Sequence, residues 1–297
     1  MDPLYVFVHI PKTGGTTLIK NITRNLRQDE CLEINIDTLK VDAKVDRKKY
    51  QEAFEKLVNK NGRHLNNLKF IYGHTIPYGI HKFFQREVRY ITFLRTPTKR
   101  IASQYNYLHG QYQSGLDKKL RERFKDIYFV KGKPRNFWGW YQNKFLPENQ
   151  DLALLSTYQI LNKLGYVDSK SKSLRDFEKD LNKFYFIGIY KNYAKDSLYL
   201  YHQFEMKKYF FSENISRKVV DINKNKKMKL QIKKDYLKSN ILFQAGLNFN
   251  KAFIKKHPEY WQIIRKEKIK QTILMPITQT LYNPLGLAKW LRRTLQN

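Results

Sequence analysis

The feature that most constrains the fold is residues 4–17, LYVFVHIPKTGGTT. Residues 4–10 are almost all apolar, which is typical of a buried central strand. Pro11 ends this strand because proline cannot donate a hydrogen bond to a sheet ladder. Gly14 and Gly15 follow, and a helical pattern then runs from about Thr17 to Arg27. The stretch therefore predicts a strand, a glycine turn and a helix in direct succession.

Such a succession can hold an anion. Two glycines let backbone N–H groups turn toward a phosphate or sulfate, and the helix N-terminus adds partial positive charge. Lys12 and the threonine hydroxyls add further donors. The stretch is not a Walker A loop, in which the lysine follows the glycines. A glycine-rich turn without a ligand is the alternative, but a lysine, two glycines and threonines between strand and helix favour the anion site.

Two later strands are predicted to end in side chains that carry chemistry. Residues 68–72 lead through Gly73 to His74, and residues 88–94 lead to Arg95. Ligands of open α/β sheets bind at the carboxyl ends of the strands. A histidine there can accept a proton near neutral pH, although a lone histidine after glycine is often a turn residue. An arginine there can bind an anion through two hydrogen bonds, although it can also be a plain surface charge.

Three motifs in this chain resemble those of sulfotransferases that use PAPS (3′-phosphoadenosine 5′-phosphosulfate). PKTGGTT resembles their 5′-phosphosulfate loop, and HIPKTGGTT is most similar to the branch that includes heparan sulfate 2-O-sulfotransferases. YITFLRTPTKRIASQYNY, residues 90–107, resembles the 3′-phosphate motif, with Thr96 where the family usually has aspartate. The segment around Gly73, GH followed by PYGIH, resembles the one that carries the presumed catalytic base.

The resemblance implies a role for each matching residue. His74 would deprotonate the acceptor, with His81 as a second choice, and Lys12 would neutralise charge on the leaving oxygen. The 5′-phosphosulfate would be held by Lys12, Thr13, Gly14, Gly15, Thr16 and Thr17, and the 3′-phosphate by Arg95 and Ser103. It also implies a P-loop-like, three-layer fold, PAPS as the sulfuryl donor, no metal, and a hydroxyl acceptor, expected to be a carbohydrate.

The charge of the chain limits the classes of partner. A formal net charge of +31 calls for a polyanion, which could be nucleic acid, an anionic membrane, an acidic glycan or a charged nucleotide. No known RNA- or DNA-binding module is recognisable, which disfavours a nucleic-acid-binding protein. A nucleotide kinase or NTPase is also disfavoured, because the strand ends carry histidine and arginine where Mg²⁺ needs a carboxylate.

The alternation of apolar strands with helices predicts an α/β domain over residues 1–269, with a mainly parallel sheet and helices on both sides. Residues 270–297 are predicted to be a basic amphipathic tail broken at Pro276 and Pro284. This tail could lie on a membrane, or pack on the core or another subunit. The single cysteine, Cys31, suits a reducing compartment. Together with the lack of a recognisable signal peptide or membrane span, this low cysteine content predicts a cytoplasmic enzyme.

Other segments are read from local pattern alone. Residues 110–115 and 224–234 are predicted to be loops, the second because of its dense charge. Residues 118–125 and 192–211 are predicted to be helices. Residues 134–145 mix aromatic and basic side chains, which suits either stacking on a sugar or base ring or the packing of a helix.

Overall fold

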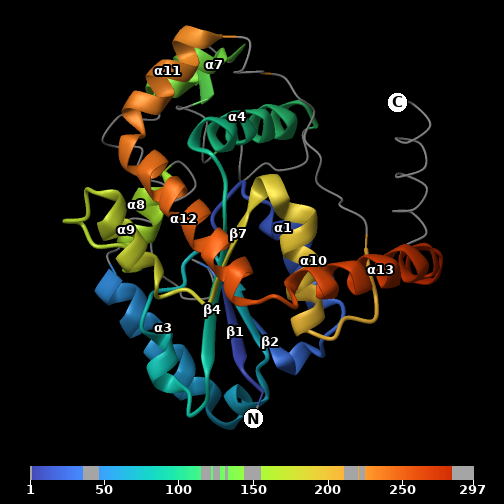
Figure 1. Cartoon of the computed structure of the whole chain (residues 1–297). Helices are drawn as coiled ribbons and strands as arrows, with labels where there is room; N and C mark the ends of the chain where they lie inside the picture. Colours follow the sequence, from blue (N-terminus) through green and yellow to red (C-terminus); the bar gives the residue numbers. More distant parts are fainter. Residues whose placement is uncertain are drawn as a thin grey trace.

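The central element of the fold is a parallel sheet. The computed structural model of the chain describes residues 2–35, 47–114, 122, 128–130, 133–143, 155–210, 220 and 225–282. Within them, a 5-stranded parallel sheet has the order β2-β3-β1-β4-β7 (Figure 1). Its strands are β1 (Leu4–Val8), β2 (Cys31–Ile34), β3 (Phe70–Gly73), β4 (Val88–Leu94) and β7 (Phe186–Ile189). A small antiparallel pair consists of β5 (Phe129–Val130) and β6 (Lys133–Pro134).

β1 lies in the middle of the sheet, as its apolar sequence predicts. All of its residues are buried, because helices cover both faces of the sheet. Val8 pairs with Gly73 of β3 and with Thr92 of β4, so the carboxyl ends of these three strands lie side by side. The segments that follow these strands therefore meet at one edge of the sheet.

Alternate side chains of β1 enter two different cores. Leu4, Val6 and Val8 pack in the first core, whereas Tyr5 and Phe7 pack in the second. The first core is covered by α3 (Arg47–Asn61), α8 (Thr157–Lys163), α9 (Leu174–Leu181) and α12 (Leu237–Lys256). The second is covered by α1 (Gly15–Thr23), α10 (Tyr193–Gln203) and α13 (Tyr260–Tyr282) (Figure 1). The predicted fold class, a mainly parallel sheet between two helical layers, is confirmed.

A third apolar cluster lies beyond the carboxyl edge of the sheet. It joins α4 (Pro97–Ser114), α7 (Phe137–Asn143) and α11 (Lys226–Asp235) (Figure 1). Phe137, Trp140 and Tyr141 of α7 are buried in this cluster, so most of the aromatic segment serves packing. Trp138 of the same helix is 37% exposed. The 3₁₀ turns among the described residues are η1 (Gln28–Glu30), η2 (Gly62–Asn67), η3 (Ile80–Phe83) and η4 (Tyr190–Asn192).

Two segments that the sequence predicts as loops are helical, and two predicted helices end early. The helix predicted from about Thr17 to Arg27 is α1, which ends at Thr23. Residues 110–114 continue α4, and residues 226–235 form α11, whose first turn is capped by the Asn225 side chain. Ile232 of α11 is buried, so an apolar contact stabilises this helix. The many lysines of the segment are the reason why the sequence predicts a loop there. Residues 118–121 and 123–125 lie outside the described part of the chain.

The predicted helix over residues 192–211 ends at Gln203, because the chain then turns to run beside α1. Asn21 of α1 accepts from the Phe210 backbone N–H (2.8 Å) and donates to the Phe210 carbonyl (3.3 Å). Asn25, one turn later, binds the backbone of Lys208 in the same way. Asn21 of α1 and Asn25, which lies just after the end of α1, thus replace the helical hydrogen bonds of this segment.

The predicted tail does not begin at a structural boundary. Position 270 falls inside α13, which continues through Pro276 to Tyr282. Leu274 and Met275 pack against the second core, and Thr278 is buried. Residues 283–297 lie outside the described part of the chain. None of the described helices combines the length and apolar character needed to cross a membrane.

Candidate functional site

The turn after β1 is shaped by two residues in the left-handed region of backbone space. Lys12 has φ 69° and Gly14 has φ 96°. Such a φ is uncommon for a residue with a side chain, so the surroundings must hold Lys12 in place. Thr13 between them is fully buried, and its hydroxyl donates to the Ile10 carbonyl (2.8 Å). The Thr13 side chain therefore closes the turn, which leaves only its backbone for a ligand.

Helix α1 begins directly after this turn with an open N-terminus. No side chain caps the helix at Gly14, and its first turn contains no acidic residue. The first N–H groups of a helix have no intrahelical partner, and the helix dipole makes this end electropositive. The Thr16 side chain is exposed here, and that of Thr17 is half-buried. The helix start is thus built to receive an anion.

Both glycines of the turn are required by rings that pack against them. A Cβ atom at Gly15 would lie 2.1 Å from Cδ2 of the His9 ring. A Cβ atom at Gly14 would lie 2.9 Å from the Tyr193 ring. The helix start therefore rests on a histidine from β1 and on an aromatic side chain from the segment after β7.

Lys12 and Arg95 lie together at this edge of the sheet. Lys12 Nζ lies 3.9 Å from the centroid of the Tyr107 ring. Arg95, directly after β4, donates from Nη1 to the Lys12 carbonyl (3.1 Å). The Arg95 guanidinium also lies 4.0 Å from the centroid of the Tyr190 ring. Its Nε is buried and has no hydrogen-bond partner among the described residues.

Arg100 is a further cation that the sequence does not single out for binding. It is 3% exposed, and it donates from Nε to the Pro11 carbonyl (2.9 Å) and from Nη1 to the Leu155 carbonyl (2.8 Å). Its Nη2 is buried without a hydrogen-bond partner in the part of the chain that is described. Arg100 therefore fixes the turn through Pro11 and leaves one donor unused. Its position one helical turn before Ser103 is the signal that could have found it.

Lys12 and Arg95 are half-buried, Arg100 is buried, and the three cations lie together at the turn. Burial, with the charges of Arg95 and Arg100 as smaller causes, lowers the pKa of Lys12 to about 8. Burial also lowers the pKa of Arg95, and it lowers that of Arg100 to about 10. None of the three forms a salt bridge with a described carboxylate. A bound anion would stabilise their charged forms.

Ser103 lies on the face of α4 that meets the turn. It follows Arg100 by three residues and precedes Tyr107 by four, so all three share one side of the helix. Arg100 and Tyr107 contact Pro11 and Lys12 of the turn. Ser103 is half-buried, and its hydroxyl makes no hydrogen bond to a described residue.

His74 is oriented by the backbone of His9. Nδ1 of His74 lies 2.6 Å from the His9 carbonyl, and the two rings stack with centroids 4.3 Å apart. Because a carbonyl only accepts, Nδ1 must carry the proton, and the neutral ring then has its lone pair on Nε2. Burial lowers the pKa of His74, although the hydrogen bond to His9 opposes the shift. The neutral His74 ring can therefore accept a proton on Nε2.

His81, the second candidate for a base, has a different environment. Its Nδ1 lies 3.0 Å from the Tyr90 hydroxyl, and that hydroxyl also accepts from the His81 backbone N–H (3.1 Å). The ring packs between Tyr78 and Tyr90. His81 therefore belongs to an aromatic cluster of η3 and β4.

The structure brings the sequence-predicted residues of the turn, Arg95 and His74 to one edge of the sheet. Sequence reasoning missed the aromatic rings around them, Tyr107, Tyr190 and Tyr193. These rings come from segments far from the turn in sequence, and aromatic residues in helices and after strands are usually core. No local pattern distinguishes them.

Comparisons with known proteins find similarity at the level of structure only. No protein-family model matches the sequence, and no curated protein matches it. A solved structure of a sulfotransferase from Alicyclobacillus acidocaldarius is similar over 82% of this chain and 94% of that chain. The two are 9% identical, and the TM-score is 0.39. The case for function rests on the geometry of the site.

Proposed function

We propose that this protein transfers a sulfuryl group from PAPS to a hydroxyl group. The observation that carries the proposal is the trio of Lys12, Arg95 and Arg100. Lys12 and Arg95 are half-buried and Arg100 is buried beside an open helix N-terminus, and no described carboxylate pairs with them. PAPS carries anionic groups at its 5′ and 3′ positions, which suits cations at two places on one edge. The unused donors on Arg95 and Arg100 fit such a ligand.

Groups after β1 and groups after β4 would bind different parts of PAPS. The N–H groups at the start of α1 and the side chains of Thr16 and Thr17 would hold the 5′-phosphosulfate. Arg95 and Ser103 would hold the 3′-phosphate, with Arg95 as the charged partner. PAPS supplies the sulfuryl group, and no metal enters the proposal.

His74 and Lys12 would act on the reacting atoms. Nε2 of His74 would take the proton of the acceptor hydroxyl, whose oxygen forms a bond to sulfur as the bond from sulfur to the 5′-phosphate oxygen breaks. Lys12 would neutralise the charge that grows on that leaving oxygen, a gain made only in the transition state. The loop and α4 would hold both reactants in line.

The acceptor proposed is a carbohydrate hydroxyl. This choice rests on the similarity of residues 9–17 to carbohydrate sulfotransferases and on a net charge of +31, which suits an acidic glycan. The proposed location is the cytoplasm, which agrees with a single cysteine, Cys31. Peripheral contact with a membrane is a further part of the proposal.

Binding to immobilised ligands tests the proposal against its rivals. We expect PAP, the 3′,5′-bisphosphate product, to bind more tightly than ATP or duplex DNA. Tighter binding of ATP would favour a nucleotide kinase, and tighter binding of DNA a nucleic-acid-binding protein. Transfer of labelled sulfate from PAPS to a panel of sugars then identifies the acceptor. The control variant for substitutions in the site is Lys99→Ala, because Lys99 is an exposed lysine beside Arg100.

A further inference from the structure

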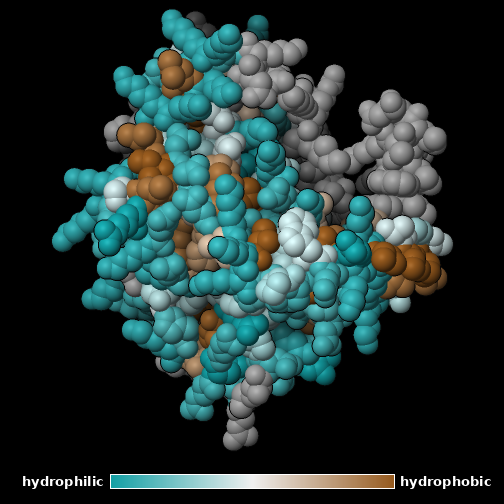
Figure 2. All heavy atoms as spheres, viewed as in Figure 1, coloured by the Kyte–Doolittle hydropathy of each residue, from teal (hydrophilic) through white to brown (hydrophobic). Residues whose placement is uncertain are grey.

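Helix α13 exposes an apolar face that lies outside the three apolar clusters of the described residues. Ile269, Ile273, Ile277 and Leu281 recur every four residues and are 59%, 60%, 52% and 67% exposed. We call these four residues the α13 stripe. Figure 1 shows this end of α13 projecting from the body of the molecule, and Figure 2 shows hydrophobic residues gathered there. Soluble proteins rarely expose a continuous apolar face without a partner for it.

The opposite face of α13 is buried in the second core. Tyr260 and Ile264 pack in that core, and Glu267 is buried where it accepts from the Tyr209 hydroxyl. Asp196 of α10 accepts from the Tyr260 hydroxyl (2.5 Å). The helix is therefore fixed by one face, and the stripe remains available on the other.

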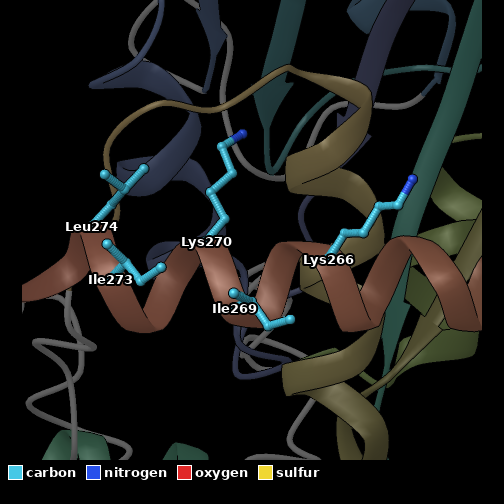
Figure 3. Close-up of a pocket in the computed structure, with 5 residues that line it drawn as sticks. All are labelled: Lys266, Ile269, Lys270, Ile273 and Leu274. Carbon is cyan, nitrogen blue, oxygen red and sulfur yellow. The ribbon is translucent and has the colours of Figure 1, made fainter.

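Basic side chains accompany the stripe. Lys266 and Lys270 line a cavity of about 420 Å³ together with Ile269, Ile273 and Leu274. Figure 3 shows both lysine side chains extending in the same direction from α13. Lys270 pairs with Glu267 (3.6 Å), whereas Arg265, Lys266 and Lys268 form no ion pair within the described part of the chain.

We propose that the α13 stripe docks this protein on an anionic lipid bilayer. A helix with a row of aliphatic side chains beside lysines lies in the plane of a membrane interface, its apolar face toward the acyl chains. Anionic headgroups attract the neighbouring Arg265, Lys266 and Lys268. A second copy of the chain is a poorer occupant, since each copy carries +31 and repels the other. The proposal concerns the location of the protein and does not depend on its reaction.

Sedimentation of the full chain with vesicles tests the docking. We expect binding to phosphatidylserine–phosphatidylcholine vesicles and little binding to phosphatidylcholine alone. The Ile273→Gln/Ile277→Gln variant should lose about tenfold in partition to the anionic vesicles, since it removes apolar area without changing charge. Lys266→Gln/Lys268→Gln should lose a similar, salt-sensitive factor of about ten.

A matched control separates the stripe from apolar surface in general. Leu230 and Leu237 are 69% and 62% exposed on α11 and α12, so Leu230→Gln/Leu237→Gln removes similar apolar area elsewhere. This control should bind vesicles as the parent does. Each variant is compared with the parent by thermal unfolding, and the singly substituted Ile273→Gln replaces the double variant if that one unfolds.

Three outcomes would overturn the proposal. The first is a full-length chain that does not sediment with anionic vesicles. The second is an equal loss of binding in the Leu230→Gln/Leu237→Gln control. The third is a dimer in sedimentation equilibrium that dissociates in Ile273→Gln/Ile277→Gln, because the stripe would then join two copies of the chain.

Discussion

Two regions of this molecule bury charge, and they treat it differently. At the joint between α10 and α13, Asp196 accepts from the Ile189 backbone N–H (2.7 Å) and from the Tyr260 hydroxyl (2.5 Å). Nearby, Glu267 accepts from the Tyr209 hydroxyl and lies 3.2 Å from Nδ1 of His202. Each buried carboxylate at the joint is satisfied by protein donors.

At the turn after β1 the half-buried and buried charges are cationic, and the described residues satisfy their donors incompletely. Arg95 and Arg100 each keep a buried nitrogen without a partner among the described residues. An unpaired buried donor costs about 1–3 kcal/mol, so it persists where something else satisfies it. The contrast teaches that buried charge alone does not mark a site. In the candidate site, buried cationic nitrogens lack a described partner, whereas the paired carboxylates belong to the scaffold.

The largest effect expected from a substitution in the region of unpaired cations is on turnover. Lys12→Ala should lower the rate of sulfuryl transfer by about 10²–10³-fold, because it removes a cation aimed at charge that develops in the transition state. Affinity for PAP should fall much less. The measurement is single-turnover transfer from labelled PAPS beside a binding titration with PAP.

The control for this prediction is Lys99→Ala, which removes the same charge from an exposed position next to the site. It should retain the parental rate. Equal losses of rate and of PAP affinity in Lys12→Ala would show that Lys12 only binds, and would remove its special role at the leaving oxygen.

The next effect is on affinity for the 3′-phosphate. Arg95→Ala should weaken PAP binding by about tenfold to a hundredfold, because charge-assisted hydrogen bonds are worth about 1.5–3 kcal/mol. Ser103→Ala should weaken it less, since a neutral hydroxyl is lost. Calorimetry with PAP and with adenosine 5′-phosphate measures both. Variants that still discriminate the two nucleotides as the parent does would refute the assignment.

Local sequence was sufficient for the central part of the fold. The apolar run of β1, its stop at Pro11 and the glycine turn lie within one short stretch, so the strand, the turn and the start of α1 follow from neighbouring residues alone. His74 and Arg95 were placed at one edge for a similar reason, because each directly follows an apolar strand. Parallel pairing of Val8 with Gly73 and Thr92 then brings their strand ends together.

The rest depends on contacts that no local pattern displays. The sequence around Arg100 does not reveal that its guanidinium reaches the Pro11 carbonyl. The lysines of α11 suggested a solvated loop, but burial of Ile232 makes a helix. Likewise Pro276 suggested a break, yet α13 continues through it, with Met275 against the second core. In each case tertiary packing outweighs the local preference.

The third prediction concerns the joint between α10 and α13, where the buried carboxylates are paired. A substitution there should affect stability but not binding. Asp196→Ala leaves the Ile189 N–H and the Tyr260 hydroxyl without their acceptor, so the free energy of unfolding should fall by about 1–3 kcal/mol. PAP affinity of the folded variant should match that of the parent. Urea unfolding with and without PAP measures both quantities. A selective loss of PAP binding in a variant of parental stability would erase the distinction between the two regions.

The smallest expected effect is on the pH dependence of kcat/KM, which reports groups of the free enzyme. Burial lowers the pKa of His74 below 6.5, and only the neutral ring can accept a proton, so activity should fall as pH drops through a midpoint below 6.5. A histidine with an unshifted pKa would give half the maximal kcat/KM at pH 6.5. A lowered pKa should therefore raise kcat/KM at pH 6.5 above this half-maximal value by less than twofold. On the alkaline side, Lys12 loses its charge through a pKa of about 8, and kcat/KM should fall there too. His81→Ala should leave the acid limb in place, because the Tyr90 hydroxyl holds the His81 ring in the aromatic cluster of η3 and β4. An acid midpoint at or above 6.5, or an acid limb that disappears in His81→Ala, would transfer the role of base away from His74.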